Sequence, residues 1–251
     1  MTTYFRTKEF EGASFVRASL KGATLRFSDV SGVPMRALEV AGLAIASHAL
    51  FFGTLIVNGV DVVPLVDAEL NKQFPGRELQ KAQTPEGLRE GWEAVQAAWR
   101  TTVEDTPPEL VDAHVPDEWS LAQTLRHLVL ATDSWLGKAI QGIEQPFHEI
   151  GQIFTGAAEM GFDMSVFRAE PPPYEEVLAV RAERQRLVTD FLATVTPELL
   201  AEERANPWGG GDDWRPTVGD CVRVILEEEW AHLRYIRRDL AIIRATDAGQ
   251  A

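Results

Sequence analysis

Apolar residues recur at every fifth position through the first quarter of the chain. This phase runs without a break from Phe5 to Leu65, giving thirteen apolar positions in succession in a chain that is 45% hydrophobic. An α-helix repeats every 3.6 residues and a β-strand every two, so neither explains a period of five. The pattern therefore predicts a structural repeat. Its clearest groups are EGASF, VRASL, KGATL, RFSDV, SGVPM, RALEV and AGLAI, at residues 11–45.

Beyond residue 83 the apolar positions follow the spacing of amphipathic helices. Thr84 before Pro85 is a helix-start signal, and Ser120 with Gln123 has the spacing of a capping box. A long connection, about residues 141–171, divides the helices into two pairs. Four helices joined in this way are typical of a four-helix bundle. The predicted helices are LREGWEAVQAAWRTTVED, LAQTLRHLVLATDSWLGKAI, YEEVLAVRAERQRLVTDFLATV and CVRVILEEEWAHLRYIRRDLAIIR.

A stretch rich in turn-forming and charged residues, QFPGRELQKAQTPEG, separates the two patterns. We therefore predict a mainly α protein with three parts. Residues 1–66 would form the repeat domain, residues 67–83 a linker, and residues 84–246 the helical bundle.

Charge and cysteine content narrow the classes of partner and compartment. The net charge of −14 argues against nucleic acid and against an anionic membrane, because both bind clustered Lys and Arg. The one cysteine, Cys221, excludes an internal disulfide, and the first residues, MTTYFRTKEFEG, lack the apolar segment of a secretory signal, so we expect a cytoplasmic protein. Residues 41–57 are uncharged and just long enough to be considered as a membrane span, but the five-residue period runs through them. We assign them to the repeat.

The five-residue groups resemble the pentapeptide-repeat family, in which four groups form one coil of a right-handed quadrilateral β-helix. The resemblance places the last residue of each group inside the coil, with a small residue two positions earlier. Ala13, Ala18, Ala23 and Ser28 fit this rule, and the later groups depart from it. About three coils would need caps or a partner domain. Long members of the family mimic DNA and bind topoisomerases; for so short a stack the resemblance implies a scaffold or docking surface, with the DNA mimic as an alternative.

Steps of four and three residues along the last predicted helix trace a single face. Apolar residues at both ends of this face indicate that it points into the core. Glu228 and His232, one turn apart, would then be sheltered, while Glu227 is expected in solvent and Glu229 near the boundary. A sheltered carboxylate needs an Arg, a protonated His or a metal ion beside it. The face holds Cys221, Ile225, Glu228, His232, Tyr235, Asp239, Leu240 and Ile243.

The second predicted helix carries His127 at the margin of its apolar stripe. If this helix faces the last one, then His127, Glu228 and His232 converge as a three-ligand set that leaves coordination positions open, as catalytic metals require. The tips of the three side chains would then lie within about 7 Å of one another. The residues also allow a site without metal, in which His127 is a core histidine and a neutral Glu228 is hydrogen-bonded to His232.

The helical region, roughly residues 58–245, resembles the DinB/YfiT-like superfamily. The stretches DEWSLAQTLRHLVLATDSWL and EEEWAHLRYIRRDL carry the resemblance. It implies a four-helix bundle with a long connection between helices two and three. It also implies a divalent metal held by one His on helix two and by two residues, usually both His, one turn apart on helix four. His127 and His232 match this pattern, and Glu228 replaces the other His.

Several members of that superfamily are transferases or isomerases that act with mycothiol, bacillithiol or glutathione, and others have no demonstrated activity. The resemblance thus implies a mononuclear metal-dependent enzyme using Zn, Ni, Mn or Fe, a low-molecular-weight thiol and a small-molecule substrate, with a homodimer as a possible assembly. Tyr235, Asp239 and His148, the last on the long connection, are expected to orient the ligands or contact substrate. Cys221 is expected to be a packed thiol. The alternative to an enzyme is a non-catalytic binding or oligomerisation module.

Overall fold

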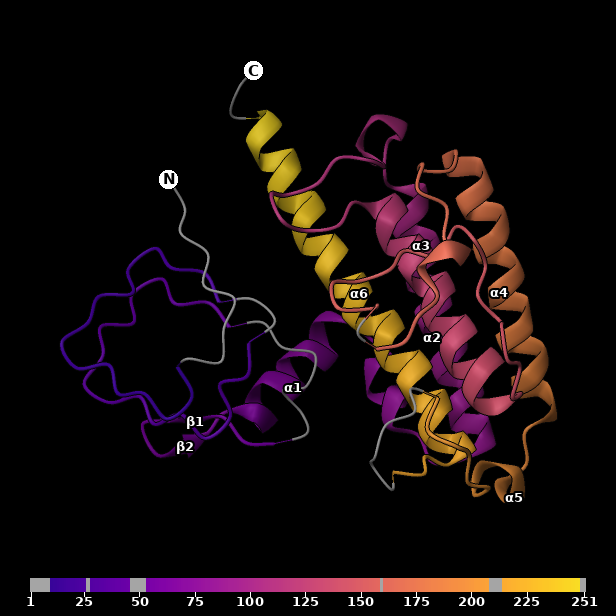
Figure 1. Ribbon diagram of the computed structural model, residues 1–251, viewed down its shortest axis with the longest axis horizontal. Helices are drawn as coiled ribbons and strands as arrows, with labels where there is room; N and C mark the ends of the chain where they lie inside the picture. Colours follow the sequence, from indigo (N-terminus) through magenta and orange to yellow (C-terminus); the bar gives the residue numbers. More distant parts are fainter. Residues whose placement is uncertain (1–9, 26–27, 46–52, 159, 208–213, 249–251) are drawn as a thin grey trace. The chain divides into compact units, whose positions relative to one another are not determined.

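The computed structural model of the chain describes residues 10–25, 28–45, 53–158, 160–207 and 214–248. The chain divides into two compact units, residues 1–46 and residues 47–251. As predicted, the protein is mainly helical, and the helices belong to the second unit (Figure 1). None of the helices formed by the described residues has both the length and the apolar character of a membrane span. Residues 46–52 of the uncharged stretch lie outside the described part.

The first unit is built from turns at regular spacing. Turns or bends recur at about five-residue intervals along its described residues, and every second one is closed by a backbone hydrogen bond. In these closed turns a glycine has a positive φ of 70–77°, which costs other residues energy. The hydrogen bonds run from the N–H groups of Ala13, Ala23, Val33 and Leu43 to the carbonyls of Phe10, Leu20, Val30 and Val40, over 3.0, 2.9, 3.2 and 3.0 Å.

The β-helix predicted for this segment is not seen in the described residues, where the only sheet is a two-stranded one in the second unit. A turn or bend every five residues leaves no run long enough to pair as a strand. The apolar residues of the five-residue phase are largely exposed, from 46% for Phe10 to 65% for Leu25.

The second unit begins with a short hairpin. Strands β1 (Ile56–Val57) and β2 (Val60–Asp61) are antiparallel, with Val57 paired to Val60. Asn58 and Gly59 both have positive φ, as a two-residue hairpin turn requires. Helix α1 (Val63–Gln73) follows. A hairpin and a helix thus occupy the region where the last groups of the five-residue period were expected.

Four long helices form the bundle, and contacts join α2 to α6, α6 to α3, α3 to α4 and α4 to α2 in a ring (Figure 1). α3 continues directly into a π-helix, η4, so the single predicted helix over residues 121–140 has two geometries. Shorter elements are η2 (Arg77–Lys81), η3 (Pro108–Leu110), η5 (Met164–Val166) and α5 (Pro197–Leu200). The bundle helices are α2 (Pro85–Glu104), α3 (Leu121–Thr132) with η4 (Asp133–Ile140), α4 (Tyr174–Thr194) and α6 (Val218–Ala248).

The predicted helix starts are confirmed. The Thr84 hydroxyl accepts a hydrogen bond from the N–H of Gly87, and Pro85 occupies the first turn. Ser120 and Gln123 form a reciprocal capping box at the start of α3. These caps satisfy backbone donors that a helix start leaves without partners. They fix where α3 begins, and with it the position of every side chain along α3.

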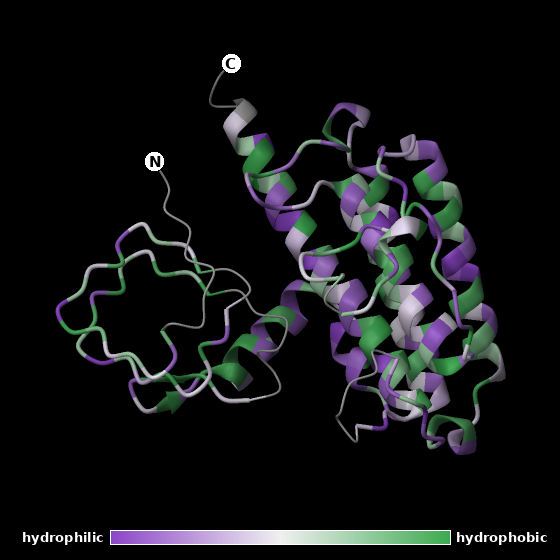
Figure 2. Cartoon of the chain, in the orientation of Figure 1, coloured by the Kyte–Doolittle hydropathy of each residue, from purple (hydrophilic) through white to green (hydrophobic). Residues whose placement is uncertain are grey.

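Apolar residues from all four helices fill the bundle, and hydrophobic and hydrophilic residues alternate along each helix (Figure 2). The most deeply buried ion pair among the described residues lies between Arg181 of α4 and Glu229 of α6, whose side chains are 3% and 1% exposed. Glu229 therefore lies inside the core, whereas the sequence analysis had placed it near the boundary of the core. The largest fully buried side chains include Trp99, Leu88, Leu121, Leu125, Leu128, Leu226, Leu233 and Ile236.

Removing one member of this pair should be strongly destabilising. Arg181→Met leaves the Glu229 carboxylate buried without a counter-charge, which should lower the free energy of unfolding by about 3–5 kcal/mol. Arg181→Met with Glu229→Leu removes both charges and should recover most of that loss. Urea unfolding followed by circular dichroism measures both. A single variant as stable as the wild type would show that the pair contributes little.

Candidate metal site

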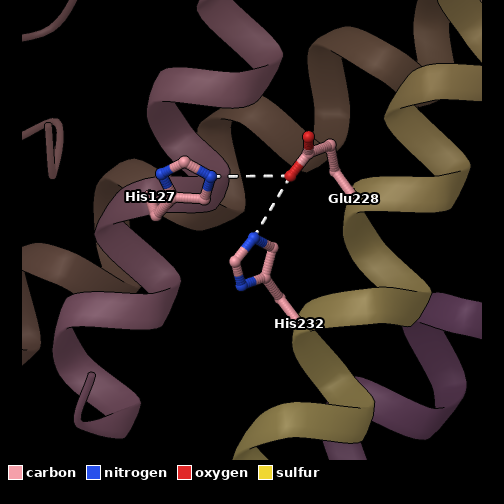
Figure 3. A group of neighbouring side chains, drawn as sticks. All are labelled: His127, Glu228 and His232. Carbon is pink, nitrogen blue, oxygen red and sulfur yellow. Dashed lines mark ion pairs between the residues drawn. The ribbon is translucent and has the colours of Figure 1, made fainter. Parts of the chain in front are cut away.

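Helices α3 and α6 bring three potential ligands together (Figure 3). Nε2 of His127, on α3, lies 3.5 Å from Oε2 of Glu228, and Nε2 of His232 lies 3.2 Å from the same oxygen. One ligand atom from each of the three residues lies within 4.8 Å of the other two. The convergence that the sequence predicted from helical spacing is therefore present in the structure.

The long connection between α3 and α4 orients His127. Nδ1 of His127 lies 3.3 Å from the backbone carbonyl of Gln152, so a proton on Nδ1 is donated to that oxygen. The backbone N–H of Gln152 in turn donates to the backbone carbonyl of Arg126, which fixes this segment of the connection against α3. With Nδ1 occupied as a donor, Nε2 points at Glu228: it donates to the carboxylate when the imidazole is protonated, and it offers a lone pair to a metal ion when the imidazole is neutral.

Aromatic rings surround the two imidazoles. The Trp119 ring, just before α3, lies 4.7 Å from the His127 ring and is stacked 5.8 Å from the His232 ring. Phe154 meets His127 edge-on at 6.4 Å, and Tyr235 meets His232 edge-on at 5.7 Å. The ligand side chains remain 11%, 33% and 15% exposed for His127, Glu228 and His232, so small solutes can reach them.

The charge on Glu228 is stabilised by both histidines. Burial opposes ionisation of its carboxyl, but the hydrogen bonds and positive charge offered by His127 and His232 outweigh it and hold the Glu228 pKa well below its usual range. Glu227 shows the opposite effect. Glu227 is partly buried, whereas its helical position had suggested that it would lie in solvent. Its burial and, to a smaller extent, the neighbouring Glu228 charge raise the pKa of Glu227 to about 7.

The other residues expected at the site have different positions. Tyr235 borders His232, as described above. Asp239 is buried and its Oδ1 accepts a hydrogen bond of 2.7 Å from Nε of Arg238, one residue away. His148 is not one of the three converging side chains. Its ring Nδ1 accepts a hydrogen bond from the backbone N–H of Ile150, and its backbone N–H donates to the Asp133 carboxylate at the start of η4.

The three side chains fit a divalent ion. A tetrahedral ion with bonds of about 2.0–2.1 Å holds its ligand atoms about 3.4 Å apart, close to both distances made by Oε2 of Glu228. Two imidazole nitrogens and a carboxylate oxygen are donors that Zn and several transition metals accept. Three protein ligands also leave at least one coordination position for a small molecule.

Comparison with known families places the helical region in one of them. The family model described as the DinB superfamily matches residues 88–236, more than half of the chain. The chain belongs to the DinB superfamily. The match runs from α2 into α6 and includes all three ligand candidates. No curated protein and no solved structure matches the chain.

Several residues around the DinB site were not predicted from the sequence. Trp119 covers both imidazoles, and its loop is tied to α6 by an ion pair of 3.3 Å between Glu118 and Arg238. Phe154 and the carbonyl of Gln152 come from the long connection. Trp119 could have been found from the sequence, because a tryptophan directly before the N-cap residue Ser120 lies at the same end of α3 as the capping box. The Gln152 carbonyl could not, because every residue has a backbone carbonyl.

Cys221 lies on the same face of α6, two turns before Glu228, but it is fully buried in the core. Burial, with a smaller effect of the Asp220 charge, raises the pKa of the Cys221 thiol to about 11. The thiol should therefore stay protonated and inaccessible at neutral pH, consistent with the packed thiol expected from the sequence.

We expect Ellman's reagent at a pH of about 8 to modify native Cys221 at least about 100-fold more slowly than the denatured chain, because reaction requires local unfolding. The absorbance of the released thiolate gives both rates, and Cys221→Ser provides the blank. Rapid modification of the folded protein would mean that this thiol is accessible.

Proposed function

We propose that this DinB-superfamily protein is a mononuclear divalent-metal enzyme that acts with a low-molecular-weight thiol. It would either transfer the thiol sulfur to a small-molecule substrate or isomerise a substrate with the help of the thiol. The observation that carries the proposal is the convergence of His127, Glu228 and His232, with ligand atoms within 4.8 Å of one another and side chains still partly exposed. The superfamily is generally metal-dependent, which supports the same interpretation.

Each part of the chain around the site has a definable role in this chemistry. His127, Glu228 and His232 would hold the ion, which when bound lowers the pKa of a thiol or water and so supplies a nucleophile near neutral pH. The carbonyl of Gln152 fixes the His127 ring with Nε2 directed at the site. Trp119 and Phe154 limit water around the imidazoles, which strengthens electrostatic interactions there.

A non-catalytic binding module is the second candidate. The feature that favours it is the ion-paired Glu228, because two protonated histidines can satisfy this carboxylate without a metal. The two candidates differ in a measurable way. Only the enzyme requires that a divalent ion bind at the three side chains.

For residues 10–45 we propose a pentapeptide-repeat scaffold that presents a docking surface. Its support is the recurrence of turns in step with the apolar residues. A DNA mimic directed at a topoisomerase is a poorer explanation, because residues 1–46 contain six basic and four acidic residues. A phosphate mimic requires a strong excess of acidic residues.

The metal proposal predicts about one equivalent of Zn, Ni, Mn or Fe in protein prepared without a histidine tag. His127→Ala and His232→Ala should each weaken binding of the same metal by more than about 100-fold, since even residues behind a ligand contribute 10–100-fold. Elemental analysis gives the stoichiometry, and competition with a chromophoric chelator gives the affinities.

His114→Ala and His148→Ala are matched controls, because they remove other imidazoles of the same chain and should leave the affinity unchanged. An equal loss in the controls, or less than about a tenth of an equivalent after reconstitution, would exclude a specific site.

Trp119 offers an independent test of where the metal binds. A bound paramagnetic ion such as Cu²⁺ quenches a nearby indole, and the Trp119 ring lies 4.7 Å and 5.8 Å from the two imidazole rings. Trp119→Phe should therefore remove the largest share of Cu²⁺-dependent quenching of tryptophan fluorescence. Trp214→Phe, a tryptophan that contacts Trp135 instead, is the control. Unchanged quenching in Trp119→Phe would place the ion elsewhere.

A further inference from the structure

Tyr235, which borders the candidate metal site, lies against two arginines of α6. The guanidinium carbon of Arg234 lies 5.0 Å from the centre of the Tyr235 ring, and that of Arg238 lies 5.6 Å from it. Nη2 of Arg234 also donates a hydrogen bond of 3.3 Å to Oη of Tyr235. Since the same ring meets His232 edge-on at 5.7 Å, the Arg234 guanidinium and the His232 imidazole contact the same tyrosine.

The two arginines differ in how their charge is compensated. Arg238 is paired with Asp239 at 2.7 Å and with Glu118 at 3.3 Å. Arg234 makes no ion pair with any carboxylate in the part of the chain that the structure describes, and its side chain is only partly exposed. In a protein with a net charge of −14, carboxylates are abundant. What distinguishes Arg234 is its position: a partly exposed guanidinium without a counter-charge among the described residues is held on the tyrosine that borders His232.

We propose that the small molecule bound at this site carries a carboxylate and that Arg234 binds it. The inference rests on the proposed function and specifies the class of ligand. A guanidinium presents several N–H donors in a planar fork that matches a carboxylate, and holding it on a tyrosine ring reduces the entropy lost on binding. Tyr235 positions Arg234 through the ring and the hydroxyl, so the carboxylate site depends on both residues.

The test compares two thiols of similar size that differ in charge, thioglycolate and 2-mercaptoethanol, on the full-length protein loaded with Co²⁺. Thiolate coordination to Co²⁺ gives a near-ultraviolet charge-transfer band, so each titration reports binding at the metal and requires no knowledge of the substrate. Because thioglycolate can also chelate Co²⁺ through its carboxylate, the ratio of the two affinities is compared between variants. Arg234 should contribute on the order of tenfold to the wild-type preference for thioglycolate, the size expected for one charge-assisted contact in a partly exposed site.

Arg234→Gln should lower the ratio of the two affinities about tenfold relative to the wild type while leaving the affinity for 2-mercaptoethanol unchanged. Arg186→Gln is the matched control, because Arg186 is an exposed arginine on α4 that makes no ion pair in the described part of the chain, and it should keep the wild-type ratio. Arg234→Lys keeps the charge but loses the fork, so it should retain only part of the preference.

The outcomes separate the two proposals. If Co²⁺ binds to the wild-type protein and to Arg234→Gln with the same affinity, and Arg234→Gln retains the wild-type preference for thioglycolate, the carboxylate proposal is wrong and the metal site stands. A wild-type ratio near one leads to the same conclusion. If Co²⁺ does not bind at all, both proposals fail. Far-ultraviolet circular dichroism of each variant confirms that the fold is retained, and Arg234→Lys provides the measurement if Arg234→Gln does not fold.

Discussion

One carboxylate oxygen shared by two imidazoles determines much of the organisation around the site. Glu228 and His232 are both on α6, but His127 comes from α3, so the second imidazole reaches Glu228 only when the two helices are held together. A partly buried carboxylate without compensation costs several kcal/mol or becomes neutral. The contact between α3 and α6 therefore sets the geometry of the candidate site as well as the packing of the bundle. With or without a metal ion, this contact brings the three ligand atoms within reach of one centre.

Several polar contacts hold α3 and the connection that follows it in position. Asp133, where α3 becomes the π-helix η4, is buried and bonded to Arg184 of α4 at 2.8 Å. The same carboxylate accepts the N–H of His148, which anchors the long connection. From that anchor the connection returns along α3 and presents the Gln152 carbonyl to His127. His148 thus holds the connection in place through its backbone N–H, while its imidazole accepts a hydrogen bond from the N–H of Ile150.

The parts of this structure that follow from local periodicity could be predicted from the sequence. Capping residues set the starts of α2 and α3, and the helical period put Glu228 and His232 on one face, as the structure shows. Properties that depend on a partner from elsewhere in the chain could not. The helical period alone placed Glu229 near the boundary of the core. Its burial depends on a charge partner, Arg181, which comes from α4, and no local pattern reveals that partner. Likewise, five-residue spacing indicated a repeat but could not decide between strands and turns.

The carboxylate ligand changes the electrostatics of the site, and this connects Glu228 with Arg234. A divalent ion held by two neutral imidazoles and one carboxylate has a net charge of +1, whereas three imidazoles would leave it at +2. The lower charge attracts an anionic ligand less strongly, and a protein with a net charge of −14 repels anions at long range. Arg234, without a counter-charge in the described chain, adds one positive charge on the tyrosine that borders the site. A glutamate in place of a histidine at the metal is thus compatible with binding of an anionic small molecule, because Arg234 supplies positive charge and its planar guanidinium matches the geometry of a carboxylate.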